Sequence, residues 1–162
     1  MSLYERLHEL FEYRDGNLYW KTNRGSKKCK GKKAGCLTVQ GYDQFRVREL
    51  GGAMKVHRAV YLMHHKYLPE FIDHINGNRS DNRIENLRSA TKEENGQNRI
   101  MPSHNTSGVK NVSWMKNNKK WGVHLRINGK KRWFGLHDDL EFAELVAMEA
   151  RNKYHGEYAK HD

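Results

Sequence analysis

The sequence predicts an α+β protein in two parts, the second of which is a three-stranded antiparallel sheet packed on one helix. Three observations predict this class. Apolar residues recur at helical spacing near both ends of the chain, apolar and polar residues alternate over 121–127, and glycine-containing turns separate short strand-like runs. The mean hydropathy of −1.01 and the hydrophobic content of 36% indicate a small core, while the plentiful aromatic residues argue against disorder.

Local patterns predict the elements of the first part. The first is a helix over residues 3–13, capped by Ser2, and a strand over 18–20 follows it. Next come a hairpin around Gly51-Gly52, formed by residues 42–50 and 53–56, and a helix over 56–67 that ends before Pro69. A strand over 71–75, a polar loop and a strand over 87–90 follow, and Thr91 with Glu94 caps a further helix. That helix holds Asn95 and Gly96, which are poor helix formers, so we expect that a functional site selected them.

The second part begins after residues 99–107, which lack periodicity and read as a linker. Strands are expected over 109–114, 121–127 and 131–136, with a tight turn at Asn128-Gly129. Asp138 and Glu141 can cap a final helix, whose one face carries Ala143, Val146, Ala147, Ala150 and Tyr154. On the sheet, Trp121, Val123 and Leu125 should pack on this helix, while His124, Arg126, Lys131 and Trp133 face away and either read DNA or form a solvated basic face.

The charge narrows the possible partners. The 162 residues include 30 Lys and Arg against 19 Asp and Glu, a formal net charge of +11 spread along the whole chain. Such a field favours polyanions, first nucleic acid and then a membrane surface, but no apolar run approaches the length of a spanning helix. The N-terminus lacks a signal-peptide pattern, so a cytoplasmic location is expected.

The two cysteines, Cys29 and Cys36, cannot complete a four-cysteine zinc site by themselves, and their spacing is not Cys-x-x-Cys. We expect reduced thiols in a loop. A zinc site completed by distant histidines is the alternative. Separately, residues 24–33 are rich in Lys, Gly and Ser and predict an exposed basic loop that either contacts phosphate or is solvated.

The strongest functional signal is Asp73-His74, followed by Asn86 and Asn95. A carboxylate and an amide oxygen are hard ligands that suit Mg²⁺ or Mn²⁺, and an imidazole beside them can take a proton from water at neutral pH. The alternative is that the polar residues after His74 only form turns. A calcium loop fits poorly, because Gly77 is off register and no Glu closes the loop.

Residues 56–98 resemble the HNH endonuclease family, in the form found in phage genomes and intron homing enzymes. The resemblance lies in Val56-His57-Arg58, Asp73-His74-Ile75-Asn76-Gly77-Asn78, Asp81-Asn82-Arg83, Glu85-Asn86-Leu87-Arg88, Thr91 and Asn95. It implies a ββα-metal finger in which His74 is the general base, Asp73 and Asn95 hold one divalent cation, and Asn86 braces the loop and orients His74. Many relatives have His where this chain has Asn95.

Four further residues of this region are weaker candidates. Arg58, Arg83 and Arg88 either contact phosphate or are solvated surface charges. His57 opens a helix, and we expect it to have a structural hydrogen-bonding role, with phosphate contact as the alternative.

The C-terminal part resembles the plant ethylene-response-factor (Apetala-type) DNA-binding domain. The resemblance lies in Ser107-Gly108-Val109, Lys120-Trp121, Arg126-Ile127, Asn128-Gly129-Lys130, Trp133-Phe134-Gly135 and His155-Gly156-Glu157-Tyr158-Ala159. It implies that seven side chains face DNA, namely Lys110, Ser113, Lys120, His124, Arg126, Lys131 and Trp133. Asn111 stands where the plant domains have Gly, and their arginines near Ser113 are missing, so base specificity does not transfer.

Together the resemblances predict a nuclease domain with its lead-in over 1–98, a linker over 99–107 and a DNA-targeting domain over 108–162. The expected function is a divalent-metal-dependent endonuclease of phage or homing type that nicks double-stranded DNA as a monomer, encoded by a phage or prophage in a bacterial host. A non-catalytic, sequence-specific DNA-binding regulator is the alternative, and a nuclease acting on RNA is a weaker one.

Overall fold

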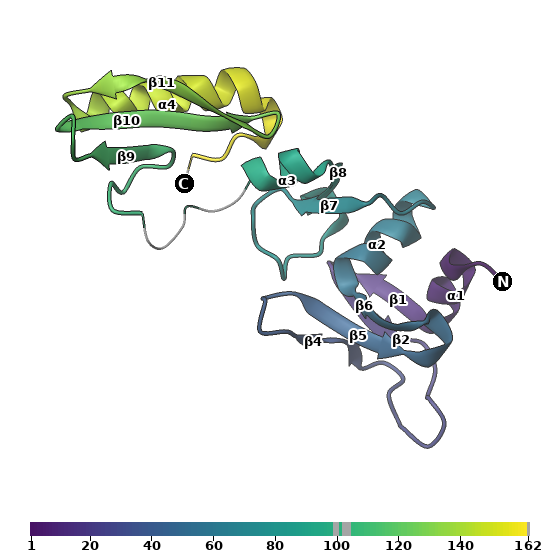
Figure 1. The fold of residues 1–162 in the computed structure, drawn as a ribbon. Coiled ribbons are helices and arrows are strands. Elements are labelled where there is room, and N and C mark those ends of the chain that lie inside the picture. Colours follow the sequence, from purple (N-terminus) through teal and green to yellow (C-terminus); the bar gives the residue numbers. More distant parts are fainter. Residues whose placement is uncertain (99–100, 102–104, 162) are drawn as a thin grey trace. The chain divides into compact units, whose positions relative to one another are not determined.

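The computed structural model describes residues 1–98, 101 and 105–161. The chain divides into two compact units, Met1–Ala90 and Thr91–Asp162 (Figure 1). Both units mix helices with small antiparallel sheets, which confirms the α+β class. The domain bounds expected from the sequence stay predictions, and residues 99–100 and 102–104 of the predicted linker lie outside the described residues.

The first unit contains three antiparallel sheets, ordered β1-β2-β3, β4-β5-β6 and β7-β8. Its elements are α1 (Leu3–Leu10), β1 (Phe11–Arg14), β2 (Asn17–Trp20), β3 (Lys33–Ala34), β4 (Cys36–Leu37), β5 (Asp43–Val47), the 3₁₀ turn η1 (Arg48–Leu50), β6 (Gly52–Lys55), α2 (Val56–His65), β7 (Phe71–His74), the 3₁₀ turn η2 (Ile84–Asn86) and β8 (Leu87–Ala90). α2 packs against α1 and the strands, and Leu7, Phe11, Leu18, Phe45 and Val60 are among the buried core residues.

Two of the sequence predictions for this unit need correction. The first helix ends at Leu10, because buried Phe11 begins a strand that pairs with β2 instead of continuing the helix. The second helix ends at His65, where Lys66 adopts a left-handed conformation with φ of 63°. The Ser2 cap is confirmed, since its hydroxyl accepts from the backbone N–H of Glu5.

A tight approach fixes the β1–β2 turn. Asp15 and Gly16 both have positive φ, 43° and 79°. A Cβ atom on Gly16 would lie 2.7 Å from the backbone nitrogen of Arg83, in the loop that follows β7. Glycine is therefore required at this position for two reasons, the left-handed backbone and the space taken by Arg83.

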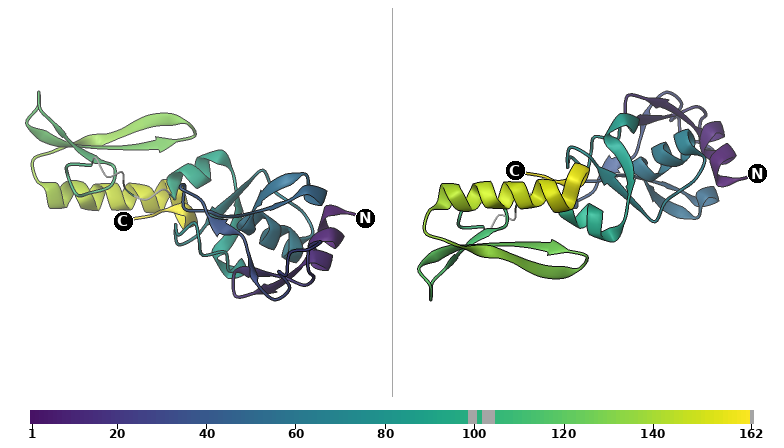
Figure 2. Two further views of the ribbon diagram at one scale, coloured as in Figure 1. Left: turned by 90° about the horizontal axis from the view of Figure 1, so that it is seen from below. Right: turned by 90° about the horizontal axis from the view of Figure 1, so that it is seen from above.

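The second unit contains α3 (Lys92–Gln97), β9 (Val112–Met115), β10 (Lys120–Ile127), β11 (Lys130–His137), α4 (Leu140–His155) and the 3₁₀ turn η3 (Gly156–Tyr158). Its sheet has the order β11-β10-β9, and α4 lies along one face of it (Figure 2). Val112, Val123 and Leu125 of the sheet and Ala143, Ala147 and Ala150 of α4 form the core between them. The small alanines let the helix approach the sheet closely.

Three details of this unit correct the sequence predictions. The first strand begins at Val112, three residues later than expected, because Asn111 has φ of 69° and cannot continue a strand. Asp139, not Asp138, caps α4, its carboxylate accepting from the backbone N–H of Phe142 at 2.8 Å. Tyr154 is exposed, and Arg151 is the buried residue in that turn of the helix.

The turn between β10 and β11 matches its sequence signal. Asn128 and Gly129 have φ of 50° and 74°, the left-handed pair that a two-residue hairpin turn requires. Among the described residues, no helix combines the length and the apolar character needed to cross a membrane.

Candidate active site

β7 and β8 form a two-stranded antiparallel sheet (Figure 1). Its register pairs Asp73 with Arg88. The Asp73 carboxylate accepts hydrogen bonds from Arg88 Nε at 3.0 Å and Nη2 at 2.9 Å, and its side chain is only 5% exposed. A buried carboxylate is costly unless a positive charge or hydrogen-bond donors compensate it. Arg88, for which the sequence left phosphate contact and a solvated surface charge open, instead pairs with the predicted metal ligand in this structure.

His74 ends β7 and is buried. Its Nε2 lies 3.2 Å from Asn82 Oδ1, and the Asn82 amide nitrogen donates to Ser80 O at 3.2 Å, which fixes the orientation of the amide. Since an amide oxygen only accepts, the proton of the neutral imidazole lies on Nε2 and the basic lone pair on Nδ1. Asn82, itself buried, had been expected from the sequence only as part of a family motif.

Burial lowers the pKa of His74, and hydrogen bonding to Asn82 and the charges of Asp73 and Asp81 oppose part of that shift. The imidazole is therefore neutral at pH 7 and able to accept a proton. A general base must be in this state before it can act.

Asn86 holds the loop between β7 and β8 in place. Its Oδ1 accepts from the backbone N–H of Asn76 at 3.0 Å, and its Nδ2 donates to Asp81 O at 2.8 Å and to Asn76 Oδ1 at 3.0 Å. Arg83 forks onto the Asp81 carboxylate with two bonds of 2.8 Å and lowers the Asp81 pKa to about 2. The loop that follows the imidazole is thus tied at both ends by side chains.

His57, from the first turn of α2, lies against His74. The two ring centroids are 5.0 Å apart at an interplanar angle of 77°. Burial lowers the pKa of His57 to about 3, helped by the nearby His74 and Lys55, and its Nδ1 has no hydrogen-bond partner among the described residues. The sequence marked His57 by its motif, but no sequence signal indicated that it touches His74.

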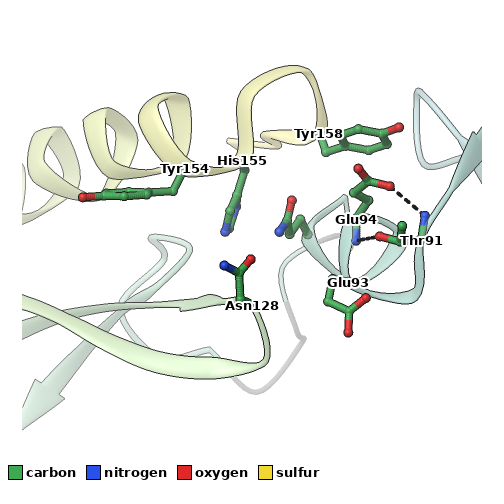
Figure 3. A pocket seen from close by; sticks show the side chains of 8 residues that line it. Thr91, Glu93, Glu94, Asn128, Tyr154, His155 and Tyr158 are labelled. Carbon is green, nitrogen blue, oxygen red and sulfur yellow. Dashed lines mark hydrogen bonds between the residues drawn. The ribbon is translucent and has the colours of Figure 1, made fainter.

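Asn95 lies on α3, in the second unit, and is half-buried. The predicted capping box of α3 is present, because the Thr91 hydroxyl accepts from Glu94 N–H and the Glu94 carboxylate accepts from Thr91 N–H (Figure 3). Lys110 donates to Gln97 O at 3.2 Å, so this predicted DNA-contact lysine tethers the end of α3.

A cavity of about 420 Å³ adjoins α3 within the second unit. Figure 3 shows His155 at the end of α4 and Asn128 of the β10–β11 turn on one side of it, and the α3 side chains on the other. His155 Nε2 lies 3.2 Å from Arg126 O, whereas its Nδ1 has no hydrogen-bond partner in the described part of the chain. His155 and Asn128 line this cavity and were not among the predicted site residues.

The other two arginines considered as phosphate contacts, Arg58 and Arg83, also bond to groups of the protein. Arg58 donates to Glu70 O at 3.1 Å, and Arg83 pairs with Asp81 and, at 3.9 Å, with Glu85. Within the described residues, no three His, Cys, Asp or Glu side chains gather where they could hold a metal ion. Cys29 and Cys36 are free thiols, in line with the expected reduced state.

On the C-terminal sheet, four of the predicted DNA-facing residues share one face. His124 lies opposite Trp133 with ring centroids 5.4 Å apart, and Arg126 lies opposite Lys131. The Lys131 ammonium sits 4.4 Å from the centre of the exposed Trp133 ring. Ser113 lies opposite Gly122 on the neighbouring strand. The Trp133 ring packs over Gly122, since a Cβ atom added to that glycine would lie 3.0 Å from the ring. Lys120, by contrast, pairs with Asp138 at 3.1 Å.

Comparison of the sequence with known proteins finds a family and a relative. Residues 54–97 match the model of the HNH endonuclease family. The chain is also 37% identical over 90 residues to Protein 3.8 of Escherichia phage T7, an alignment that covers 56% of this chain and 74% of that protein. No solved structure shows significant similarity. The chain therefore belongs to the same family as phage T7 Protein 3.8 and carries an HNH endonuclease domain.

Proposed function

We propose that the protein is a divalent-metal-dependent endonuclease, of phage or homing type, that hydrolyses phosphodiester bonds of double-stranded DNA and nicks one strand as a monomer. The observation that carries the proposal is His74, which burial keeps neutral and Asn82 orients, next to Asp73 and inside the segment that matches the HNH family. The net charge of +11 supports a polyanionic substrate.

His74 acts as the general base. Asn82 fixes the proton on Nε2, so Nδ1 takes the proton from the attacking water. Asn86 keeps the following loop in the conformation that presents this nitrogen, since its amide bonds both Asn76 and Asp81. The imidazole is neutral at pH 7 and is therefore in the state that accepts a proton.

The donor set fits a hard divalent cation. Asp73 supplies a carboxylate and Asn95 an amide oxygen, the ligand types that Mg²⁺ and Mn²⁺ prefer, and few protein ligands suit an ion that keeps several waters. When bound, the cation supplies a Lewis acid for the phosphate and relieves charge on the leaving oxygen. Arg88 holds the Asp73 carboxylate in place beforehand.

The C-terminal unit is the DNA-targeting module of this proposal, with an Apetala-type role. Its support is the sheet face on which His124 and Lys131 contact the exposed Trp133 and Arg126 lies opposite Lys131. A sheet face with cations and a flat aromatic ring suits a DNA groove and its phosphates.

A plasmid-relaxation assay with Mg²⁺, with Mn²⁺ and with EDTA tests the function. We expect open circles with either metal, none with EDTA, and a loss of at least 100-fold in rate for His74→Ala, the contribution typical of a general base. His65→Ala, at an exposed position of α2, is the matched control and should nick at the wild-type rate. Wild-type relaxation by His74→Ala would refute the catalytic assignment. DNA binding without cleavage of any substrate would favour the non-catalytic regulator.

A further inference from the structure

Tyr42 lies between two cations next to the imidazole pair. The Lys55 ammonium is 3.8 Å from the centre of the Tyr42 ring, and the Arg79 guanidinium carbon is 5.1 Å from it. The same ring lies 5.4 Å from the His57 ring and 6.1 Å from the His74 ring, centre to centre. The cluster therefore joins β6, α2 and the β7–β8 loop around one aromatic ring.

The positive charge in this cluster is not balanced. Burial lowers the pKa of Lys55, and the charges of Arg58 and Arg79 lower it further. Neither Lys55 nor Arg79 forms an ion pair with a carboxylate of the described residues. The bond that Arg79 does form is donated to a backbone oxygen, Gln40 O at 3.0 Å. Like charges held together at a partly buried place repel, and an anion bound between them removes that cost.

The helix that begins here adds to the positive potential. Lys55 is the N-cap residue of α2, a helix of 10 residues. No described side chain caps that end, and its first turn holds no acidic residue. The partial positive charge of a helix N-terminus favours anions over the first turn. The helix end therefore acts in the same direction as the two side chains.

We propose that Lys55 and Arg79, supported by the Tyr42 ring, form a phosphate-binding site for the DNA backbone beside His74. This inference rests on the proposed nuclease function, since it names the backbone phosphate next to the bond that is cut as the occupant. Lys55 and Arg79 bind that phosphate, and the Tyr42 ring fixes the direction of both side chains through cation–π contacts. The site thereby sets the distance between the strand and the base.

Salt dependence of DNA binding tests the site independently of cleavage. Binding of a short duplex to the full chain is measured in EDTA at several salt concentrations, for the wild type, Lys55→Gln, Arg79→Gln and the double variant. A neutralised phosphate contributes about 0.9 to the slope of log K against log salt, so the double variant, which leaves this one phosphate without its cations, should lose about 0.9. Arg48→Gln, at an exposed position in the turn at the other end of the β5–β6 hairpin, is the matched control and should leave the slope unchanged.

The aromatic support is tested by Tyr42→Phe and Tyr42→Leu. Phenylalanine keeps the ring and should keep the wild-type slope, whereas leucine should reduce it. Thermal melting of each variant shows that the fold is intact. If the wild type nicks DNA in a His74-dependent way but the double variant keeps the full slope, the phosphate site is wrong and the nuclease function stands. If the slope falls as expected but no variant or wild type nicks DNA, phosphate binding stands and the nuclease function fails.

Discussion

Arg88 and Asp73 face each other across the β7–β8 hairpin, and the guanidinium donates two hydrogen bonds to one carboxylate oxygen, at 3.0 and 2.9 Å. The pair joins the residue proposed to hold the metal to an arginine that the sequence offered either as a phosphate contact or as a solvated charge. In the structure the arginine supplies the positive charge that the buried carboxylate needs.

Replacing Arg88 should expose the dependence of Asp73 on a cation. Arg88→Gln leaves a buried carboxylate without its charged partner, so the free energy of unfolding should fall by about 1–3 kcal/mol in urea titrations. Added Mn²⁺ should then raise the melting temperature of the variant more than that of the wild type, because the ion replaces the lost charge. Equal shifts in the two proteins would argue against Asp73 as a metal ligand.

Asn86→Ala should loosen the loop after His74. The substitution removes three hydrogen bonds and leaves the Asn76 N–H and the Asp81 carbonyl without this partner, which should cost about 1–3 kcal/mol of stability. Nicking should fall with it, because His74 loses its support. Glu85→Ala, at the exposed neighbouring position of η2, is the control. A variant that is destabilised but nicks at the wild-type rate would limit Asn86 to a structural role.

The buried His57 should make the protein sensitive to acid. Its pKa is about 3 in the fold, below the ordinary value of 6.5, so between these values the unfolded chain binds a proton that the folded chain does not. Stability from this residue is present above pH 6.5 and is lost as the pH falls towards 3, at up to about 1.4 kcal/mol per pH unit. In His57→Phe, urea unfolding measured from pH 4 to 7 should depend less steeply on pH. An unchanged slope would contradict the assignment.

The sheet of the second unit offers a matched pair of neighbouring cations. Lys131 lies on the face with Trp133, while the guanidinium of Arg132 lies 5.9 Å from the Tyr154 ring of α4, on the opposite face. Lys131→Gln should therefore weaken DNA binding and reduce its salt slope by about 0.9, as expected for one lost phosphate contact. Arg132→Gln should change both less. Equal effects of the two substitutions would indicate that DNA binding depends on the total charge of the unit and not on this face of the sheet.

Trp133→Ala should weaken DNA binding more than either charge change, because an exposed ring that contacts nucleic acid contributes about 1–3 kcal/mol. Fluorescence anisotropy with a labelled duplex measures the affinity. Trp133 is 53% exposed, so its loss should leave the melting temperature of the unit nearly unchanged. Wild-type affinity in this variant would remove the aromatic ring from the proposed interface.

Short-range chemistry in the sequence determined much of this protein. The Ser2 and Thr91 capping boxes, the Asn128-Gly129 turn and the strand at residues 87–90 follow from residues within a few positions of each other, and the structure contains all of them. The Asp73-His74 pair was also evident from the sequence, because ligand and base chemistry depends on residue type and order. Local patterns gave the wrong result where strand pairing competed with them. Phe11 fits the helical pattern of residues 3–13, but it pairs with β2 as part of a strand.

Only the tertiary structure decided which distant side chains meet. Lys55 and Arg79 on either side of Tyr42, His57 against His74, and Asn82 as the partner of the imidazole depend on how strands and loops pack. Burial is decided at the same stage, and burial is what lowers the pKa of His57 and His74. A sequence lists the charges and rings, but their distances and their separation from water are properties of the folded chain.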